Sequence, residues 1–169
     1  MYWGIFMRIL VAYYSRTGNT QFVAEKIAEQ LSAETCEVID KKSRKGKLAF
    51  VKGGYESRRK KLTEIEVSKT IDNFDLIIIG SPVWSDGITP AIRTFIEKNE
   101  FSGKQVSIFV TLKGNNPEKA LVNFKEAILP EIPLAELGII DDLKNREKSE
   151  QQIKNWCEEI KKQIDVEQR

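Results

Sequence analysis

Short apolar segments alternate with amphipathic ones along this chain of 169 residues, and no other feature of the sequence constrains its fold as strongly. The apolar segments are rich in Ile, Val and Leu, which is typical of strands buried on both faces of a parallel sheet. Between them, apolar residues recur at helical spacing, as at Val23, Ile27 and Leu31. This alternation favours an α/β fold in which helices cover both faces of one parallel sheet.

The pattern also locates the individual elements. The predicted strands are Arg8–Tyr14, Cys36–Ile39, Leu76–Ile79, Gln105–Thr111 and Leu134–Ile140. The predicted helices are Gly18–Leu31, Pro90–Lys98, Pro117–Leu129 and a last helix that begins near Lys148. The length of the chain suits a single domain over residues 1–169.

Two stretches do not follow the alternation. Residues 41–67 are rich in Lys, Arg and Gly, and they are predicted to form a long basic loop with one short helix. Residues 1–6 have two interpretations. They are either an extension upstream of a native start at Met7, or an edge segment that packs on the rest of the chain.

The chain contains no histidine. This excludes Ser-His and Cys-His nucleophilic sites and most zinc sites, so we expect redox chemistry here to depend on a bound cofactor. Cys36 and Cys157 lie far apart and form no C-x-x-C pair, which predicts buried thiols in a reducing compartment, the cytoplasm. No apolar run approaches the roughly 20 residues that a membrane-spanning helix needs, so no membrane association is expected.

A hydroxyl-rich segment lies between the first predicted strand and the first predicted helix. Its residues are Ser15, Arg16, Thr17, Gly18, Asn19 and Thr20. Hydroxyl groups can donate hydrogen bonds to a phosphate, and a glycine lets the backbone approach it closely. The helix that follows adds N–H groups and the positive end of its dipole. A plain capping turn is the alternative, but the position after the first strand favours a phosphate site.

Together with Tyr13 and Tyr14, this segment resembles the phosphate loop of flavodoxins, [ST]-x-[ST]-G-[NT]-T after a strand that ends in aromatic residues. The resemblance extends from Met7 to the last predicted helix, and Gly80–Glu97 resembles in particular a short-chain subgroup. It implies a flavodoxin-like three-layer sandwich whose five-stranded parallel sheet has the order 2-1-3-4-5. It also implies that FMN binds at the carboxyl ends of the strands.

The same resemblance assigns two further loops to the flavin ring. The loop after the third predicted strand contributes Ser81, Pro82, Val83, Trp84 and Gly87. The loop after the fourth contributes Thr111, Leu112, Lys113, Gly114 and Asn115.

Within these loops, Trp84 is expected to stack on the flavin, since flat aromatic surfaces stack well on such rings. A role as a core anchor remains open for it. Gly87 is expected to let the backbone turn toward the ring, or to be an ordinary turn glycine. Many flavodoxins place a tyrosine over the outer flavin face in the second of these loops. This sequence has none there, and Tyr55 is the candidate substitute.

Charge is distributed unevenly along the chain. Ten Lys or Arg residues and a single acid, Glu56, lie between Lys41 and Lys61, while the rest of the chain has more acidic than basic residues. A basic patch of this kind can steer an acidic partner. A redox partner protein is therefore expected to dock on Lys41–Lys61, and a solvated loop is the alternative. Since no recognised nucleic-acid-binding module is present, no nucleic acid is expected as a partner.

Three functions fit these features. The first is an FMN-dependent electron carrier, the second an NAD(P)H-dependent FMN or quinone reductase on the same fold, and the third a non-redox binding domain that keeps only the scaffold. The phosphate loop has the flavodoxin form rather than the G-S-x-R-x-x-S pattern common in FMN reductases, which favours the carrier. Because every position of that loop is intact, the scaffold ranks last.

Overall fold

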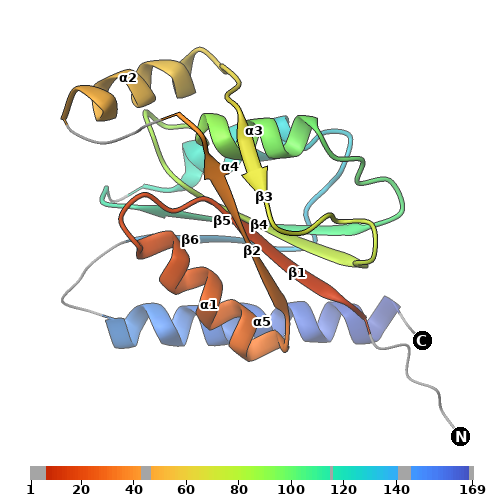
Figure 1. Ribbon diagram of the computed structural model, residues 1–169. Coiled ribbons are helices and arrows are strands. Elements are labelled where there is room, and N and C mark those ends of the chain that lie inside the picture. Colours follow the sequence, from red (N-terminus) through yellow and green to blue (C-terminus); the bar gives the residue numbers. More distant parts are fainter. Residues whose placement is uncertain (1–6, 43–46, 115, 141–145, 168–169) are drawn as a thin grey trace, which may run out of the picture.

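The computed structural model of the protein describes residues 7–42, 47–114, 116–140 and 146–167 (Figure 1). Its strands are β1 (Ile9–Tyr13), β2 (Glu34–Asp40), β3 (Ile65–Val67), β4 (Leu76–Pro82), β5 (Gln105–Leu112) and β6 (Glu136–Ile140). Its helices are α1 (Asn19–Leu31), α2 (Lys47–Arg58), α3 (Pro90–Glu97), α4 (Glu118–Ala127) and α5 (Arg146–Glu167). Residues 1–6, for which the sequence left two interpretations, lie outside the described residues.

The described strands form one sheet in the order β3-β2-β1-β4-β5-β6. Without β3, this is the predicted order of five parallel strands, so the flavodoxin-like fold class is confirmed. The predicted strand number was wrong in one respect, because β3 adds to the edge and runs antiparallel to β2, with Val67 opposite Val38. β3 is three residues long and has Glu66 at its centre, so it lacks the apolar run by which the other strands were predicted.

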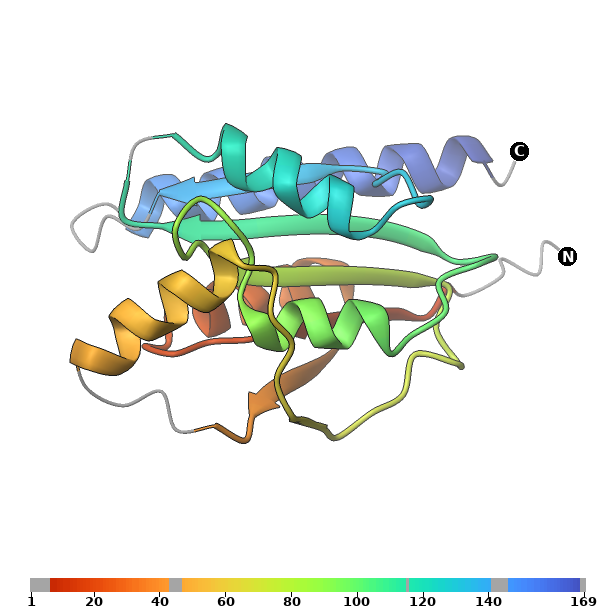
Figure 2. The ribbon, with the colours of Figure 1, turned by 90° about the horizontal axis from the view of Figure 1, so that it is seen from above.

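Helices cover both faces of the sheet (Figures 1 and 2). On one face α1 and α5 lie side by side, and Ile27 and Ile160 are fully buried between them and the sheet. On the other face α3 and α4 bury Ile92 and Phe124 completely. Because both faces are covered, the central strands β4 and β5 are almost continuously apolar. No helix in the described part of the chain is long and apolar enough to cross a membrane.

The segment 41–67 is more regular than the sequence predicted. The 12-residue helix α2 and the strand β3 replace most of the expected long loop. Gly53 and Gly54 lie inside α2, and each disfavours a helix by roughly 1 kcal/mol relative to alanine. Gly53 is required by a close contact, because a Cβ atom there would lie 2.7 Å from the Trp84 ring. Packing on the loop after β4 therefore stabilises α2, and Figure 2 shows the two next to each other.

β4 continues beyond its predicted end at Ile79, and it includes Gly80, Ser81 and Pro82. These three residues stay in register with β5. Gly80 allows this pairing because the Phe109 ring lies directly over it, and a Cβ atom at that position would lie 2.0 Å from Phe109 Cζ. The sequence suggested a loop from Gly80 onward, since an isolated glycine after an apolar run commonly marks a turn.

Gly80→Ala is expected to lower the free energy of unfolding by about 1–3 kcal/mol, because the added methyl group overpacks the Phe109 ring. Urea unfolding followed by circular dichroism measures this difference. Gly114→Ala is the matched control, since the nearest atom to a Cβ there is Leu112 Cδ1 at 3.8 Å. Adding Phe109→Leu to Gly80→Ala should recover part of the loss. A Gly80→Ala variant as stable as the wild type would contradict this account of the contact.

Candidate functional site

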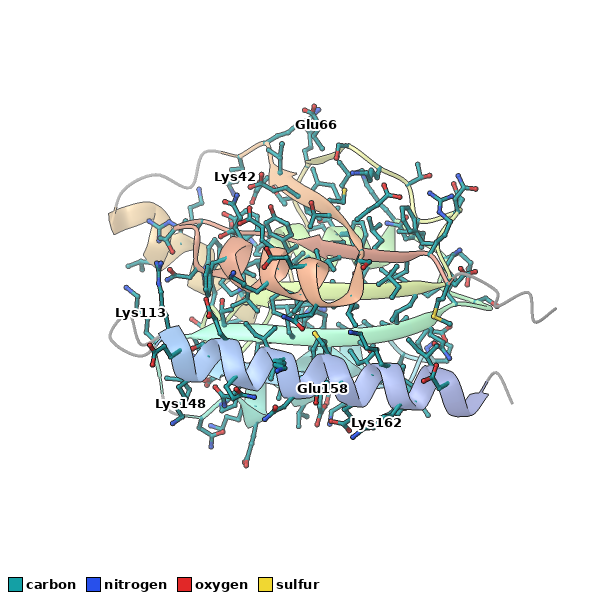
Figure 3. All side chains as sticks on the ribbon, turned by 90° about the horizontal axis from the view of Figure 1, so that it is seen from below. Lys42, Glu66, Lys113, Lys148, Glu158 and Lys162 are labelled. Carbon is teal, nitrogen blue, oxygen red and sulfur yellow. The ribbon has the colours of Figure 1, made fainter. Side chains whose placement is uncertain are left out.

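A cavity of about 220 Å³ lies where three loops meet, at the carboxyl ends of β1, β4 and β5. Its lining residues are Arg16, Thr17, Asn19, Thr20, Pro82, Val83, Trp84, Thr111, Leu112 and Lys113. All of them are among the residues singled out from the sequence, and Figure 3 shows Lys113 at this edge of the molecule. The loops meet because the carboxyl ends of neighbouring parallel strands share one edge of the sheet, which is where open α/β sheets bind ligands.

The start of α1 opens toward this cavity without a side-chain cap. Gly18 occupies the N-cap position with a φ of 90°, a left-handed conformation that suits glycine. The first turn of α1 contains no acidic residue. The positive end of the helix dipole is thus left without a negatively charged side chain, and the first-turn N–H groups suit an anion in the cavity.

Thr20 and Thr111 connect the start of α1 to the end of β5. Their hydroxyl oxygens lie 2.8 Å apart, and both side chains are buried. Each hydroxyl has one hydrogen and two lone pairs, so only one of the two donates in this bond. When Thr111 donates, the Thr20 hydrogen stays available for an acceptor in the cavity.

The loop after β4 closes in a tight turn from Trp84 to Gly87. The N–H group of each of these residues donates to the carbonyl oxygen of the other, over 2.9 and 3.1 Å. Ser85 and Asp86 between them have positive φ angles of 48° and 62°, which is the geometry of a two-residue type I′ turn. Gly87 was expected to let the backbone turn toward the ring, or to be an ordinary turn glycine. It is the last residue of this turn, and the left-handed conformations fall on Ser85 and Asp86.

α2 holds this turn from outside, a contact that the sequence did not predict. The Ser57 hydroxyl lies 2.8 Å from the Trp84 carbonyl oxygen and 2.7 Å from that of Ile88, so it donates to this pair of acceptors. On the same helix Glu56 is buried and forms an ion pair with Lys42. The signal available in the sequence was that Glu56 is the only acid in a strongly basic segment.

Trp84 lies between the cavity and α2. Its side chain is 5% exposed, and its ring meets the Tyr14 ring edge to face with 5.7 Å between centroids. Gly53 of α2 packs against the same ring. Trp84 therefore lines the cavity and also belongs to the core. Tyr55, the candidate cover for a flavin, lies on the exposed side of α2, with the Arg59 guanidinium 5.4 Å from its ring centroid.

Five further residues that were assigned from the sequence and that the structure describes lie outside the lining of this cavity. They are Ser15, Gly18, Ser81, Gly87 and Gly114. Ser15 shapes the loop after β1, because its Oγ accepts a hydrogen bond from the Gly18 N–H over 3.1 Å. Ser81 is fully buried, and its Oγ accepts from the Thr89 N–H just before α3. Asn115 lies outside the described residues.

The family model described as Flavodoxin matches residues 8–160. The chain belongs to the flavodoxin family. A flavoprotein from Lactobacillus acidophilus NCFM, crystallised in complex with FMN, is 26% identical and has a TM-score of 0.70, with 78% of this chain and 93% of that chain covered. Oxidised flavodoxin 2 from Bacillus cereus is 21% identical and has a TM-score of 0.61, with 92% of this chain and 98% of that chain covered. The family predicted from the phosphate loop is thus confirmed.

Trp84→Ala is expected to lower the free energy of unfolding by about 3–5 kcal/mol, the usual loss when a buried large aromatic side chain is truncated. The loss should appear without any ligand, because the contacts with Tyr14 and Gly53 are intramolecular. Chemical denaturation of the ligand-free protein is the appropriate measurement. The control is Tyr55→Ala on the exposed side of α2, which should change stability by less than about 0.5 kcal/mol. Equal losses in the two variants would refute a core role for Trp84.

Proposed function

We propose that this member of the flavodoxin family binds FMN in the cavity between its three loops and carries electrons between other proteins. The observation that carries the proposal is the uncapped start of α1, which opens into a cavity that the loops after β4 and β5 complete. The FMN complex of the similar flavoprotein from Lactobacillus acidophilus supports the choice of cofactor. When bound, FMN supplies a ring that accepts and releases electrons.

The residues around the cavity fit the two ends of this cofactor. At the phosphate end, the loop after β1 provides the Thr17 and Thr20 hydroxyls and the N–H groups of the first turn of α1. At the ring end, Val83, Trp84 and Leu112 provide apolar contact and exclude water. Different lining residues serve the phosphate and the ring in this proposal, so phosphate binding and ring binding can be tested separately.

Thr17→Ala combined with Thr20→Val is expected to weaken FMN binding by about tenfold or more for each charge-assisted hydrogen bond that is lost. Riboflavin, which lacks the phosphate, should bind the variant and the wild type alike. Titration followed by flavin fluorescence gives both dissociation constants. Thr70→Ala, at an exposed threonine outside the cavity lining, is the matched control. Wild-type FMN affinity in the double variant would refute the phosphate assignment.

The surface of α2 and the residues after it supports docking of an acidic redox partner. Lys52, Arg59 and Lys61 are exposed, and the exposed Tyr55 ring lies under the last two of these cations. Since α2 also packs on the turn that starts at Trp84, a protein docked on it lies next to the proposed flavin cavity. A cationic surface in this position attracts anions over a distance of roughly one screening length, about 8 Å at physiological ionic strength.

Reversal of Lys52, Arg59 and Lys61 to Glu is expected to slow oxidation of the FMN-loaded, reduced protein by ferricyanide about tenfold at low salt. Ferricyanide is a small anionic oxidant, so it reports the sign of the field near the flavin without requiring the natural partner. Stopped-flow absorbance gives the rate, and the difference should shrink as salt is added. These substitutions avoid every residue that lines the cavity.

A control variant with the same change in net charge, but at another place on the surface, shows whether the position of the charges matters or only their sum. Lys154, Lys161 and Lys162 are exposed on α5, on the opposite face of the sheet, and Figure 3 shows Lys162 pointing away from the sheet. Their reversal to Glu should leave the rate close to that of the wild type. Equal rates in all three proteins at every salt concentration would show that the basic segment is only a solvated surface. Rapid reduction of the flavin by NADPH alone would favour the reductase instead.

The cysteines support a cytoplasmic location for this carrier. Cys36 and Cys157 are both free and buried. Burial raises the pKa of the Cys157 thiol to about 12, so that this thiol stays protonated and unreactive near neutral pH. Free buried thiols of this kind are typical of proteins kept in a reducing compartment.

A further inference from the structure

A second cavity, of about 520 Å³, lies on the other side of the turn from Trp84 to Gly87. It is lined by the end of α2, the turn residues Ser85–Gly87, Arg93 of α3 and the first turns of α4. Within the described part of the chain, the two cavities share no lining residue. Figure 2 shows the loop after β4 between α2 and α4. The Asn123 side-chain amide of α4 donates to the Asp86 carbonyl oxygen over 2.6 Å, so the wall between the cavities is fixed from both sides.

Arg93 is the unusual residue of this cavity. Its side chain is 8% exposed, and its Nε–H has no hydrogen-bond partner among the described residues. Burial lowers the pKa of Arg93, and the carboxylate of Glu97, exposed one turn further along α3, offsets only part of this effect. An arginine nevertheless stays charged in a protein, so an unmatched donor on a buried cation is destabilising. The rest of α3 inside the core is apolar or hydroxylic, which makes this position exceptional.

The surroundings of Arg93 carry an excess of positive charge. Among the described residues, four cationic side chains line the cavity, those of Arg93, Arg58, Lys60 and Lys119, against the two carboxylates of Asp86 and Glu118. Lys60 is in part engaged, at 3.9 Å from a Glu126 carboxylate oxygen. The remaining cations at the rim, Arg58 and Lys119, are exposed on α2 and α4.

We propose that this cavity binds the phosphate or carboxylate group of a small anionic molecule, with Arg93 as the principal cation and Arg58 and Lys119 at the rim. The planar guanidinium group offers paired donors that match an oxyanion, and such bonds are shorter and stronger than neutral ones. An oxyanion in the cavity that Arg93 lines balances the buried charge of its guanidinium group. The proposal does not rest on FMN binding, because the two cavities have separate linings.

Calorimetric titration and thermal unfolding at low ionic strength test the proposal, with pyrophosphate and citrate as probes on the FMN-saturated protein. At least one probe should bind saturably and raise the melting temperature. Arg93→Met should weaken that binding about 10- to 100-fold, the effect of losing charge-assisted hydrogen bonds. Arg93→Lys should retain part of the affinity, since it keeps the charge without the planar fork. Tighter binding of pyrophosphate identifies a phosphate ligand, and tighter binding of citrate a carboxylate ligand.

Stability provides an independent readout. Without added anion, Arg93→Met should melt at or above the wild-type temperature, because it removes a buried charge that the exposed Glu97 carboxylate offsets only in part. Should that variant fail to fold, the double variant Arg58→Gln, Lys119→Gln tests the rim of the cavity. It should lower the affinity for the probe several-fold. Arg59→Gln, directly after α2 and outside the cavity lining, is the matched control.

Two results would overturn the proposal: no binding of either probe, or wild-type probe affinity in Arg93→Met. Repeating the titration on the FMN-free Thr17→Ala, Thr20→Val protein keeps this test separate from the flavin proposal. An anion held in the first cavity would respond to those two substitutions, whereas one held in the second responds to Arg93.

Discussion

The three loops around the first cavity meet because Tyr13, Gly80 and Phe109 lie in register across β1, β4 and β5. Gly80 is the central one, and the Phe109 ring occupies the space that a side chain there would need. With this packing, β4 and β5 stay paired to their ends. The hydroxyls of Thr20 and Thr111 then come within hydrogen-bond distance, 91 positions apart in the chain. The geometry of the cavity thus depends on close packing one layer below it.

The turn from Trp84 to Gly87 is the second element on which the site depends. It divides the two cavities, with Trp84 on one side and Ser85–Gly87 on the other. Two consecutive residues in a left-handed conformation are strained, and such strain persists only where the surroundings fix it. Ser57 of α2 and Asn123 of α4 provide that support through hydrogen bonds to backbone carbonyl oxygens. A ligand in either cavity therefore contacts a wall that is already in place.

α2 lies in the basic segment of the chain, packs on Trp84 at the first cavity and lines part of the second. The one acid of the basic segment, Glu56, is buried in an ion pair with Lys42, so it does not weaken the positive surface outside. Exposed cations on α2 and directly after it support partner docking, while Arg58 at its end and Lys60 just beyond it line the second cavity. In the function that we propose, one short helix thus contributes to electrostatic steering, to the support of Trp84 and to anion binding.

Local signals in the sequence were enough to predict the strands of the parallel sheet and the hydroxyl-rich loop, and the resemblance of that loop to flavodoxins gave the strand order and the residues that line the first cavity. Apolar runs and a hydroxyl-rich loop can be recognised from neighbouring residues alone, because these patterns do not depend on contacts with distant parts of the chain. Tertiary contacts alone decided the rest. Gly53 and Gly54 disfavour a helix locally, yet α2 forms because Gly53 fits against the Trp84 ring. β3 forms because the edge of β2 offers it hydrogen bonds. Arg93 becomes buried because the end of α2, the turn after β4 and the start of α4 surround it at the second cavity, and no spacing in the sequence shows that its Nε–H finds no acceptor among the described residues.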